Sequence, residues 1–346
     1  MSERFFDFVA PRILRNAHVQ TLGAALPFWT GRGWTGRGWT GRGGAGPELS
    51  SEEMRIPLPG GGALRARASW QPASSGPRTA VVLVHGVGGS NESSYMRRAA
   101  IAFYRAGLHT VRLNLRGAGD SMPDAPALHH AGLIEDPQVA LEAVARHPAV
   151  KDVVLLGFSL GGNVALKLAA AWGAAIPSFV RAVATLSAPL DLVEASRGLE
   201  TVRTFPYRRY VLRKLVRQGR AFAEQHPERA NYDASKLGRL RTIRAYDEEV
   251  VAPMHGFCDA HDYYVHASSG PGLADVRVPS LVVHAADDPM VPAASVQRWL
   301  RDASAAVRVA WSERGGHVGW LEGVGEEAWT HTWAIDRVVS FLNAAG

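Results

Sequence analysis

Cysteine is nearly absent from this sequence of 346 residues, and long apolar runs are absent altogether. The single cysteine, Cys258, excludes an internal disulfide framework and fits a reducing compartment. The first residues contain no apolar core of secretory-signal length, and no stretch of about 18 uninterrupted apolar residues follows. We therefore expect a soluble, cytoplasmic protein.

The sequence also lacks a dense basic region in its main body. The net charge is +6, but residues 1–44 account for +4 of it, and the remaining 302 residues carry 32 basic against 30 acidic side chains. A nucleic-acid-binding domain normally carries a basic face of its own. The charge distribution therefore argues against a nucleic-acid partner.

Metal-binding spacings are missing as well. The sequence has 13 histidines, but none forms a His-Glu-x-x-His motif or has the cysteine or carboxylate spacing of a zinc site. We therefore expect no metal in the site.

Residues 30–44 repeat the pentad Thr-Gly-Arg-Gly-Trp and have no periodic apolar face. The repeat contains Gly31-x-Gly33-x-x-Gly36, the spacing of a dinucleotide-binding loop, but no strand or helix pattern flanks it. We interpret the repeat as a flexible insertion within an N-terminal segment, residues 1–51.

From residue 52, strand and helix patterns alternate. Continuously apolar runs such as 79–86 and 152–159 are typical of buried parallel strands, and 94–107 has helical spacing. The alternation resumes after residue 275 and ends in a helix from about Glu326. It predicts an α/β core, residues 52–192 and 276–346, with a mostly parallel sheet covered by helices on both faces. We also expect Asp136 to be the N-cap of the helix that follows it.

Residues 193–275 interrupt this alternation. The stretch 207–230 looks helical, and the segment lies between two predicted core strands. We interpret it as a helical cap insertion that covers the strand ends and shapes a substrate pocket.

Ser159 lies at a predicted corner between a strand and a helix. Gly157 and Gly161 stand two residues before and after it, and only very small residues fit at those places in so tight a turn. The corner exposes the serine hydroxyl at the end of the sheet. The pattern therefore predicts a nucleophile elbow rather than an ordinary glycine-rich turn.

A serine hydroxyl needs a base and an acid that orients the base. His317 lies on a glycine-flanked loop after the last predicted strand, and Asp287 and Asp288 follow the strand before it. The residues alone leave open which aspartate is the partner. Asp120 and Ser121 follow another strand, and we expect them to brace loops instead.

Acyl transfer also requires two backbone N–H groups that stabilise a developing oxyanion. Residues 85–90 follow the first buried strand, and His85-Gly86 lets the chain turn so that the Val87 N–H faces the pocket. Leu160, directly after the serine at a helix N-terminus, supplies the second N–H group in this interpretation.

These residues resemble the α/β-hydrolases, and within them the YheT-like esterase group that is related to eukaryotic medium-chain ester hydrolases and synthases. The resemblance covers nearly the whole chain and rests on these stretches: RNAHVQTL, HGVGGS, NLRGAGDS, GFSLGGN, TIRAYDEEVVAPMHGFCDAHDYY, HAADDPMVP and GGHVGW. The N-terminal and cap stretches are the ones that look specific to the group. The repeat at 30–44 is not part of its pattern.

The resemblance implies that Asp288 is the acid, because the Asp-x-x-Val-Pro pattern of the family fits residues 288–292, with Asp287 as second choice. It also implies that the substrate is a small-molecule carboxylic ester with a short to medium acyl chain, a class that includes acylglycerols and other lipid esters. It implies no cofactor. The alternatives are an acyltransferase that uses the same triad and a binding protein whose triad has lapsed. The His-x-x-x-x-Asp signature of acyl transfer reads His317 to Glu322 here, which speaks against the transferase.

The predicted cap is strongly basic on one stretch. Between Arg197 and Arg244 it carries thirteen basic residues against four acidic ones. Such a run is typical of a solvated helix face, and the alternative is weak peripheral contact with anionic lipid. The sequence leaves the oligomeric state open.

Overall fold

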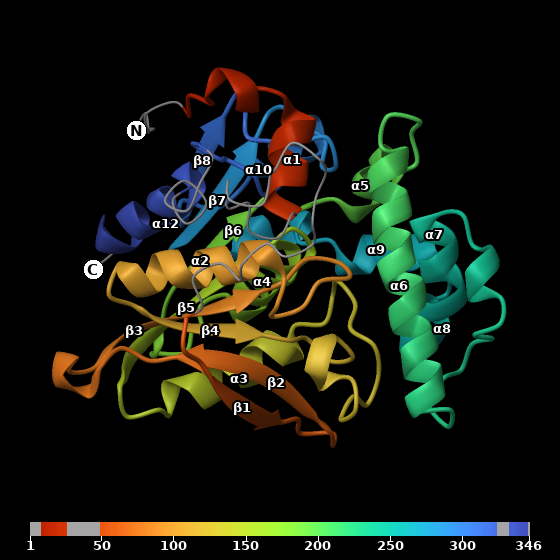
Figure 1. Ribbon diagram of the computed structural model, residues 1–346, viewed down its shortest axis with the longest axis horizontal. Helices are drawn as coiled ribbons and strands as arrows, with labels where there is room; N and C mark the ends of the chain where they lie inside the picture. The colour runs from red at the N-terminus through yellow and green to blue at the C-terminus, as the bar shows by residue number, and fades with distance from the viewer. Residues whose placement is uncertain (1–7, 26–48, 324–331, 345–346) are drawn as a thin grey trace, which may run out of the picture.

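The computed structural model describes residues 8–25, 49–323 and 332–344, and its centre is an eight-stranded sheet (Figure 1). The strand order across the sheet is β1-β2-β4-β3-β5-β6-β7-β8. The strands are β1 (Glu52–Pro57), β2 (Ala63–Ser69), β3 (Arg78–Val84), β4 (His109–Leu113), β5 (Val150–Phe158), β6 (Val180–Leu186), β7 (Ser280–Ala285) and β8 (Val307–Ser312).

Most neighbouring strands in this sheet run parallel. The pairs from β4 through β8 are all parallel, whereas β2 is antiparallel to both β1 and β4. Parallel strands bring their carboxyl ends to one edge of the sheet, where the loops that follow them meet. The predicted mostly parallel α/β architecture is confirmed.

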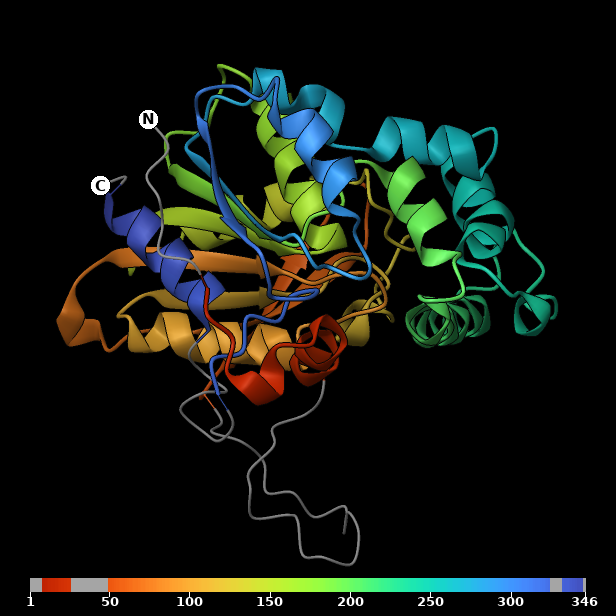
Figure 2. The ribbon, with the colours of Figure 1, turned by 90° about the horizontal axis from the view of Figure 1, so that it is seen from above.

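Helices cover both faces of the sheet. In β3, Val82 and Val84 belong to one buried apolar cluster that includes residues of α3 (Glu135–Ala145), α4 (Leu160–Trp172) and α10 (Ala293–Leu300). The alternate residues Val81 and Leu83 belong to a second cluster that includes residues of α2 (Ser94–Arg105) and α12 (Trp333–Ala344). Figure 2 shows α2 and α12 below the sheet and α4 and α10 above it. Because both faces are buried, the central strands contain continuous apolar stretches, such as Ala80–Val84 in β3 and Val153–Leu156 in β5.

The start of α3 differs from the sequence-based expectation. Asp136 is not the N-cap of this helix, which has Ile134 at that position, so the prediction was wrong. The carboxylate of Asp136 instead accepts hydrogen bonds from the backbone N–H of Arg116 at 2.8 Å and from its Nε at 2.7 Å. A fully buried carboxylate is costly without a charged partner, and this long-range pairing takes precedence over a local cap.

Residues 193–275, which we call the cap, form a group of helices at one side of the core (Figure 1). The elements of this region are α5 (Leu192–Leu199), α6 (Phe205–Gln225), the 3₁₀-helix η4 (Leu237–Arg239), α7 (Ile243–Tyr246), the π-helix η5 (Asp247–Val251), α8 (Ala252–His255), α9 (Ala260–Ala267) and the 3₁₀-helix η6 (Gly270–Asp275). Their apolar cluster, which includes Phe222 and Tyr246, is shared with core residues such as Met122, Leu128 and Met290. Of these elements, η6 packs against the core helices α4 and α10, and α9 is joined to α4 by hydrogen bonds from Asn163 to the carbonyl of Ala267 and from Lys167 to that of His266.

The N-terminal segment contributes the short helix η1 (Arg12–Leu14) and the helix α1 (Ala17–Ala25). The repeat at residues 30–44 and the predicted start of the last helix near Glu326 lie outside the described residues. In the part of the chain that the structure describes, no helix is both long enough and apolar enough to cross a membrane.

Candidate active site

Ser159 lies at the junction between β5 and α4. Its φ of 51° and ψ of −120° are rarely adopted by residues with a side chain. A methyl group on Gly157 would lie 2.2 Å from the carbonyl oxygen of Gly161, and one on Gly161 would lie 2.5 Å from that of Val84. The corner therefore has no space for side chains at either glycine, as expected for the elbow.

The side chains of Ser159, His317 and Asp288 form one chain of hydrogen bonds. Ser159 Oγ lies 2.9 Å from Nε2 of His317, and Nδ1 of His317 lies 2.8 Å from Oδ2 of Asp288. A carboxylate only accepts hydrogen bonds, so Nδ1 carries the proton and Nε2 is left to accept from the serine hydroxyl. The structure thus brings together three residues that follow three different strands, β5, β7 and β8.

Asp288 and its neighbour Asp287 have different partners. Oδ1 of Asp288 accepts from the N–H groups of residues 290 and 291 at 2.8 and 2.9 Å. Burial alone would raise the pKa of Asp288, but its interactions with His317 hold this pKa below the ordinary value. Asp287 instead accepts from the N–H of Gly316 at 2.8 Å, and burial raises its pKa. Asp288 therefore lies behind the imidazole, while Asp287 holds the adjoining loop.

Val87 and Leu160 both line the pocket that contains Ser159 and His317. Leu160 is the first residue of α4, and the first N–H groups of a helix have no partner within it. Gly86 approaches the serine so closely that a methyl group on it would lie 3.1 Å from Ser159 Cβ. Val87 and Leu160, the two predicted oxyanion donors, thus both line the pocket that contains Ser159, and the loop before Val87 lies directly against the serine.

The side chains of His85 and Tyr95 fix the loop at Gly86, and this role was not predicted from the sequence. Nε2 of His85 accepts from the N–H of Leu115 at 3.3 Å, so Nδ1 donates to the carbonyl of Gly86 at 2.8 Å. Burial lowers the pKa of His85 to about 3, which keeps the ring neutral. The hydroxyl of Tyr95 accepts from the N–H of Gly86 at 2.9 Å. The pair His85-Gly86, a histidine directly before a glycine at the end of a predicted strand, is the sequence feature that could have indicated this role.

The pocket is mainly apolar and is lined by residues of both the core and the cap. Its aliphatic lining includes Leu128, Leu192, Leu199, Leu215, Ile243 and Met290. Such a lining suits an apolar ligand with a few fixed polar contacts.

One carboxyl group, Asp247 of the π-helix η5, is part of this apolar lining. The hydroxyl of Tyr264 donates to its Oδ2 at 2.6 Å. Burial raises the pKa of Asp247 to about 7, although the bond from Tyr264 opposes the shift. Asp247 was not predicted from the sequence, because the packing of the cap buries it and no local pattern marks such an acid.

Three histidines lie beside the pocket on the core and cap sides. Burial lowers the pKa of His129 to about 4 and that of His130 to about 3, and it also lowers the pKa of His255. Nε2 of His255 is 2.8 Å from the carbonyl oxygen of Leu128. All three rings are therefore neutral near pH 7. Among the described residues, no group of three or more His, Cys, Asp or Glu side chains could hold a metal ion.

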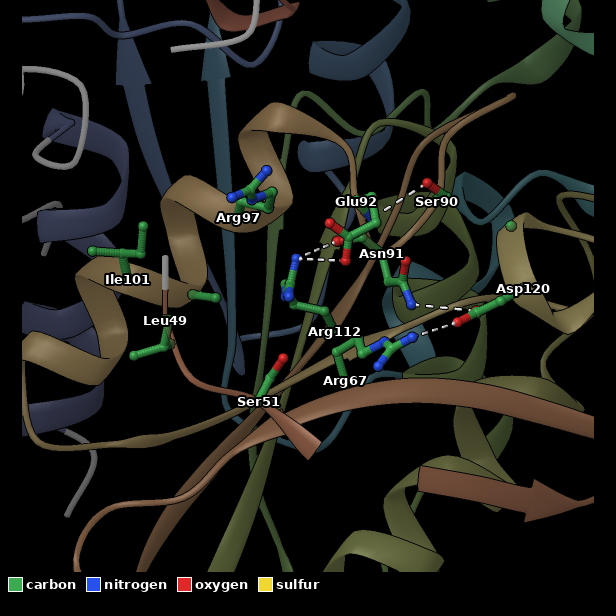
Figure 3. Close-up of a pocket in the computed structure, with 12 residues that line it drawn as sticks. Leu49, Ser51, Arg67, Ser90, Asn91, Glu92, Arg97, Ile101, Arg112 and Asp120 are labelled. Carbon is green, nitrogen blue, oxygen red and sulfur yellow. Dashed lines mark hydrogen bonds and ion pairs between the residues drawn. The ribbon is translucent and has the colours of Figure 1, made fainter. Parts of the chain in front are cut away.

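A second cavity lies between α2 and the strands β2 and β4, away from Ser159 (Figure 3). Arg67 pairs with Asp120 at 3.3 Å, and Arg112 pairs with Glu92 at 3.2 Å. The hydroxyl of Ser121 accepts from the N–H of Arg65 at 2.7 Å. Asp120 and Ser121 thus brace the loops around β2 and β4, as the sequence predicted.

Comparison with known proteins gives one family and several relatives. Residues 79–323 match the family model of the alpha/beta hydrolase fold. The chain is 29% identical to the protein YheT of Escherichia coli over 98% of this chain and 94% of that protein. It is 24% identical to a monoacylglycerol lipase of Saccharomyces cerevisiae over 72% of this chain and 56% of the yeast protein.

A solved structure agrees with these matches at the level of the fold. The esterase Pf2001 of Pyrococcus furiosus superposes with a TM-score of 0.56 and 16% sequence identity, over 86% of this chain and 93% of that one. At this identity the likeness concerns the fold alone. The resemblance predicted from the motifs is confirmed by the family match and by the similarity to YheT.

Proposed function

This chain belongs to the α/β hydrolase family, and on that premise we propose that it is a serine carboxylesterase acting on carboxylic esters with short to medium acyl chains. The observation that carries the proposal is the continuous hydrogen-bonded chain from Ser159 through His317 to Asp288 at an apolar pocket. Neither a cofactor nor a metal is needed for this chemistry.

In the proposed reaction, Ser159 Oγ attacks the ester carbonyl while Nε2 of His317 takes its proton. Asp288 keeps Nδ1 protonated and stabilises the charged ring that forms. The N–H groups of Val87 and Leu160 stabilise the negative oxygen of the tetrahedral intermediate. His317 then returns the proton to the leaving alcohol, and water releases the acid from Ser159 in a second, equivalent step.

The pocket lining supports an uncharged, largely apolar substrate. Its aliphatic side chains favour an acyl chain, the rings of His129 and His130 are neutral, and no lysine or arginine is among the described residues that line it. The similarity to a yeast protein named as a monoacylglycerol lipase favours lipid esters within this class. We therefore place acylglycerols and related lipid esters among the substrates to be tested first.

The proposal is tested by replacing the nucleophile. Ser159→Ala should lower kcat for p-nitrophenyl butyrate by more than about 1,000-fold, because nothing else supplies the attacking oxygen. Ser74→Ala, at an exposed serine of the 3₁₀-helix Ala73–Ser75, is the matched control and should leave kcat unchanged. Circular dichroism checks that both variants are folded.

Two further readouts complete this test. A fluorophosphonate probe should label the wild type and not Ser159→Ala. Hydrolysis with an added alcohol should yield the free acid rather than a new ester; a dominant new ester would make the enzyme an acyltransferase. Full turnover by Ser159→Ala would remove Ser159 from the mechanism.

We also propose that the outer face of the cap makes weak peripheral contact with anionic lipid. Arg209, Arg213, Arg217 and Arg220 are exposed on α6 at intervals of one helical turn. The exposed side chains of Phe205 and Tyr210 lie on the same helix. Basic and aromatic residues together favour an anionic membrane surface.

A further inference from the structure

The loop that carries His317 has an unusual backbone. We call residues 313–321 the histidine loop. Val318 and Trp320 have φ of 57° and 50°, values that residues with a side chain rarely adopt, and Gly316 has φ of 61°. Such a conformation persists only where the surroundings hold it in place. Since the loop is not part of the sheet, its backbone N–H groups need partners from elsewhere in the fold.

Helix α1 provides one of these partners through Thr21. The hydroxyl of Thr21 accepts a hydrogen bond from the backbone N–H of His317 at 2.9 Å and donates one to the carbonyl of Ala17 at 2.8 Å. Thr21 is only 6% exposed. Because both bonds are made by one oxygen inside the fold, the hydroxyl fixes the backbone of His317 relative to α1.

Gln20 holds the other end of the same loop. Its Oε1 accepts from the N–H of Leu321 at 2.7 Å, and its Nε2 donates to the carbonyls of Leu14 at 2.9 Å and Leu321 at 3.2 Å. The side chain is fully buried, so these bonds do not compete with solvent. Two neighbouring residues of α1 therefore attach the histidine loop at His317 itself and four residues beyond it.

The contact between α1 and the loop is also close in space. A methyl group on Gly316 would lie 2.5 Å from the carbonyl oxygen of Ala17 and 2.8 Å from Oγ1 of Thr21. One on Gly319 would lie 3.0 Å from Cβ of Gln20. The helix thus touches the loop through backbone and short side chains, and small displacements of one move the other.

We propose that α1 is a positioning element of the active site, in which Thr21 and Gln20 hold His317 at hydrogen-bonding distance from Ser159. This inference rests on the proposed esterase function. Helix α1 lies outside residues 79–323, which match the family model, so the family match does not account for this role. Thr21 and Gln20 touch neither the pocket nor Ser159; they act through the backbone of the histidine loop.

A misplacement of about 1 Å in a catalytic group costs about 100-fold in rate. Thr21→Val keeps the size and branching of the side chain but removes the hydroxyl, so we expect kcat to fall by about 10- to 100-fold while KM stays within about twofold. Thr21→Ser restores the hydroxyl and should recover kcat to within about threefold of the wild type. A purely structural role would not give this separation of kcat from KM in a folded variant.

The matched control removes a bond of α1 that does not involve the histidine loop. The hydroxyl of Ser94, the first residue of α2, donates to the carbonyl of Ala24 in α1 at 2.8 Å. Ser94→Ala removes this bond and leaves the bonds of Thr21 and Gln20 to the histidine loop, so kcat should be unchanged. An equal loss of kcat in Ser94→Ala would mean that any weakening of the packing of α1 lowers activity, and the inference would be wrong.

The rate at which a fluorophosphonate labels Ser159 separates the possible failures. Labelling requires the serine to be activated by His317, so Thr21→Val should be labelled more slowly by the same factor as kcat. If the wild type is labelled and Thr21→Val reacts at the same rate, the positioning role is refuted; if the wild type is not labelled, the proposed function fails first. Should Thr21→Val not fold, Thr21→Ala gives the same comparison with a smaller side chain.

Discussion

The core side and the cap side of the pocket are built from different interactions. On the core side, Ser159, His317 and Asp288 are joined by hydrogen bonds of 2.8 and 2.9 Å. On the cap side, the lining is aliphatic and aromatic, and its one carboxyl group, Asp247, pairs with a tyrosine instead of a cation. Directional bonds fix reacting atoms, whereas apolar packing fixes shape. In the proposed function, the core side determines the reaction and the cap side determines which ester fits.

The largest expected difference between the core and the cap is in the free energy of unfolding, when one glycine in each is replaced by alanine. A methyl group on Gly161 would lie 2.5 Å from the Val84 oxygen and 2.6 Å from the His85 oxygen, both backbone atoms of the central strand and its loop. Gly161→Ala should therefore lower the free energy of unfolding by about 3 kcal/mol or more and abolish esterase activity. Urea unfolding and the p-nitrophenyl butyrate assay measure the two effects.

Gly219→Ala provides the comparison within the cap. There the methyl group would meet side-chain atoms, Oη of Tyr246 at 3.0 Å and Cδ1 of Leu237 at 3.1 Å, which can shift. Alanine also favours the helix over glycine by about 1 kcal/mol, so the net change should stay within about 1 kcal/mol. Equal losses at Gly161 and Gly219 would contradict the difference between the two sides.

The second prediction concerns the pH dependence of stability that the cap introduces. Asp247 holds a proton in the folded protein up to a pKa of about 7, whereas its ordinary pKa is 3.8, so the wild type loses stability as the pH rises between these values. Asp247→Asn stays neutral. Its stability relative to the wild type should therefore increase by about 2 kcal/mol from pH 5 to pH 7.

Urea unfolding of both proteins at pH 5 and pH 7 measures this change. Glu224→Gln, at an exposed glutamate of α6, is the control and should show the same difference from the wild type at both pH values. A difference between Asp247→Asn and the wild type that does not vary with pH would show that the buried carboxyl is ionised throughout this range.

The smallest effect on catalysis is expected from the outer face of the cap. The double variant Arg213→Gln and Arg217→Gln should leave kcat/KM for p-nitrophenyl butyrate within about twofold, because both residues are exposed and neither lines the pocket. Each basic residue near an anionic surface contributes about 1 kcal/mol to binding, so sedimentation with phosphatidylserine vesicles at low salt should decrease clearly.

The control for the vesicle experiment changes the same charge elsewhere. Arg301→Gln and Arg308→Gln together remove two exposed arginines near α10 and β8. Their vesicle binding should equal that of the wild type. If the wild type does not prefer anionic over neutral vesicles, the lipid contact of the cap is excluded.

The elbow could be predicted from the sequence because its cause is local. Gly157 and Gly161 are required by backbone atoms within a few residues of Ser159 and by the adjacent strand, and the alternating pattern placed that strand correctly. The choice between Asp287 and Asp288 was different. The residues alone left it open, since both follow the same strand, and only their separate partners in the fold distinguish them.

Long-range contacts explain what the sequence did not reveal. The Asp136 prediction failed because Arg116, 20 residues away, competes for that carboxylate. The burial of Asp247 follows from the packing of the cap, and the role of Thr21 follows from a contact across 296 positions. Neither periodicity nor spacing within one segment carries information about such partners.

The hydrogen bond between Thr21 and His317 joins a residue that is translated early to one that is translated near the end of the chain. The hydroxyl that holds the histidine leaves the ribosome early, and the loop it must hold emerges only after nearly three hundred further residues. The proposed triad therefore cannot be completed, nor its histidine held by α1, until translation has passed the final strand of the sheet.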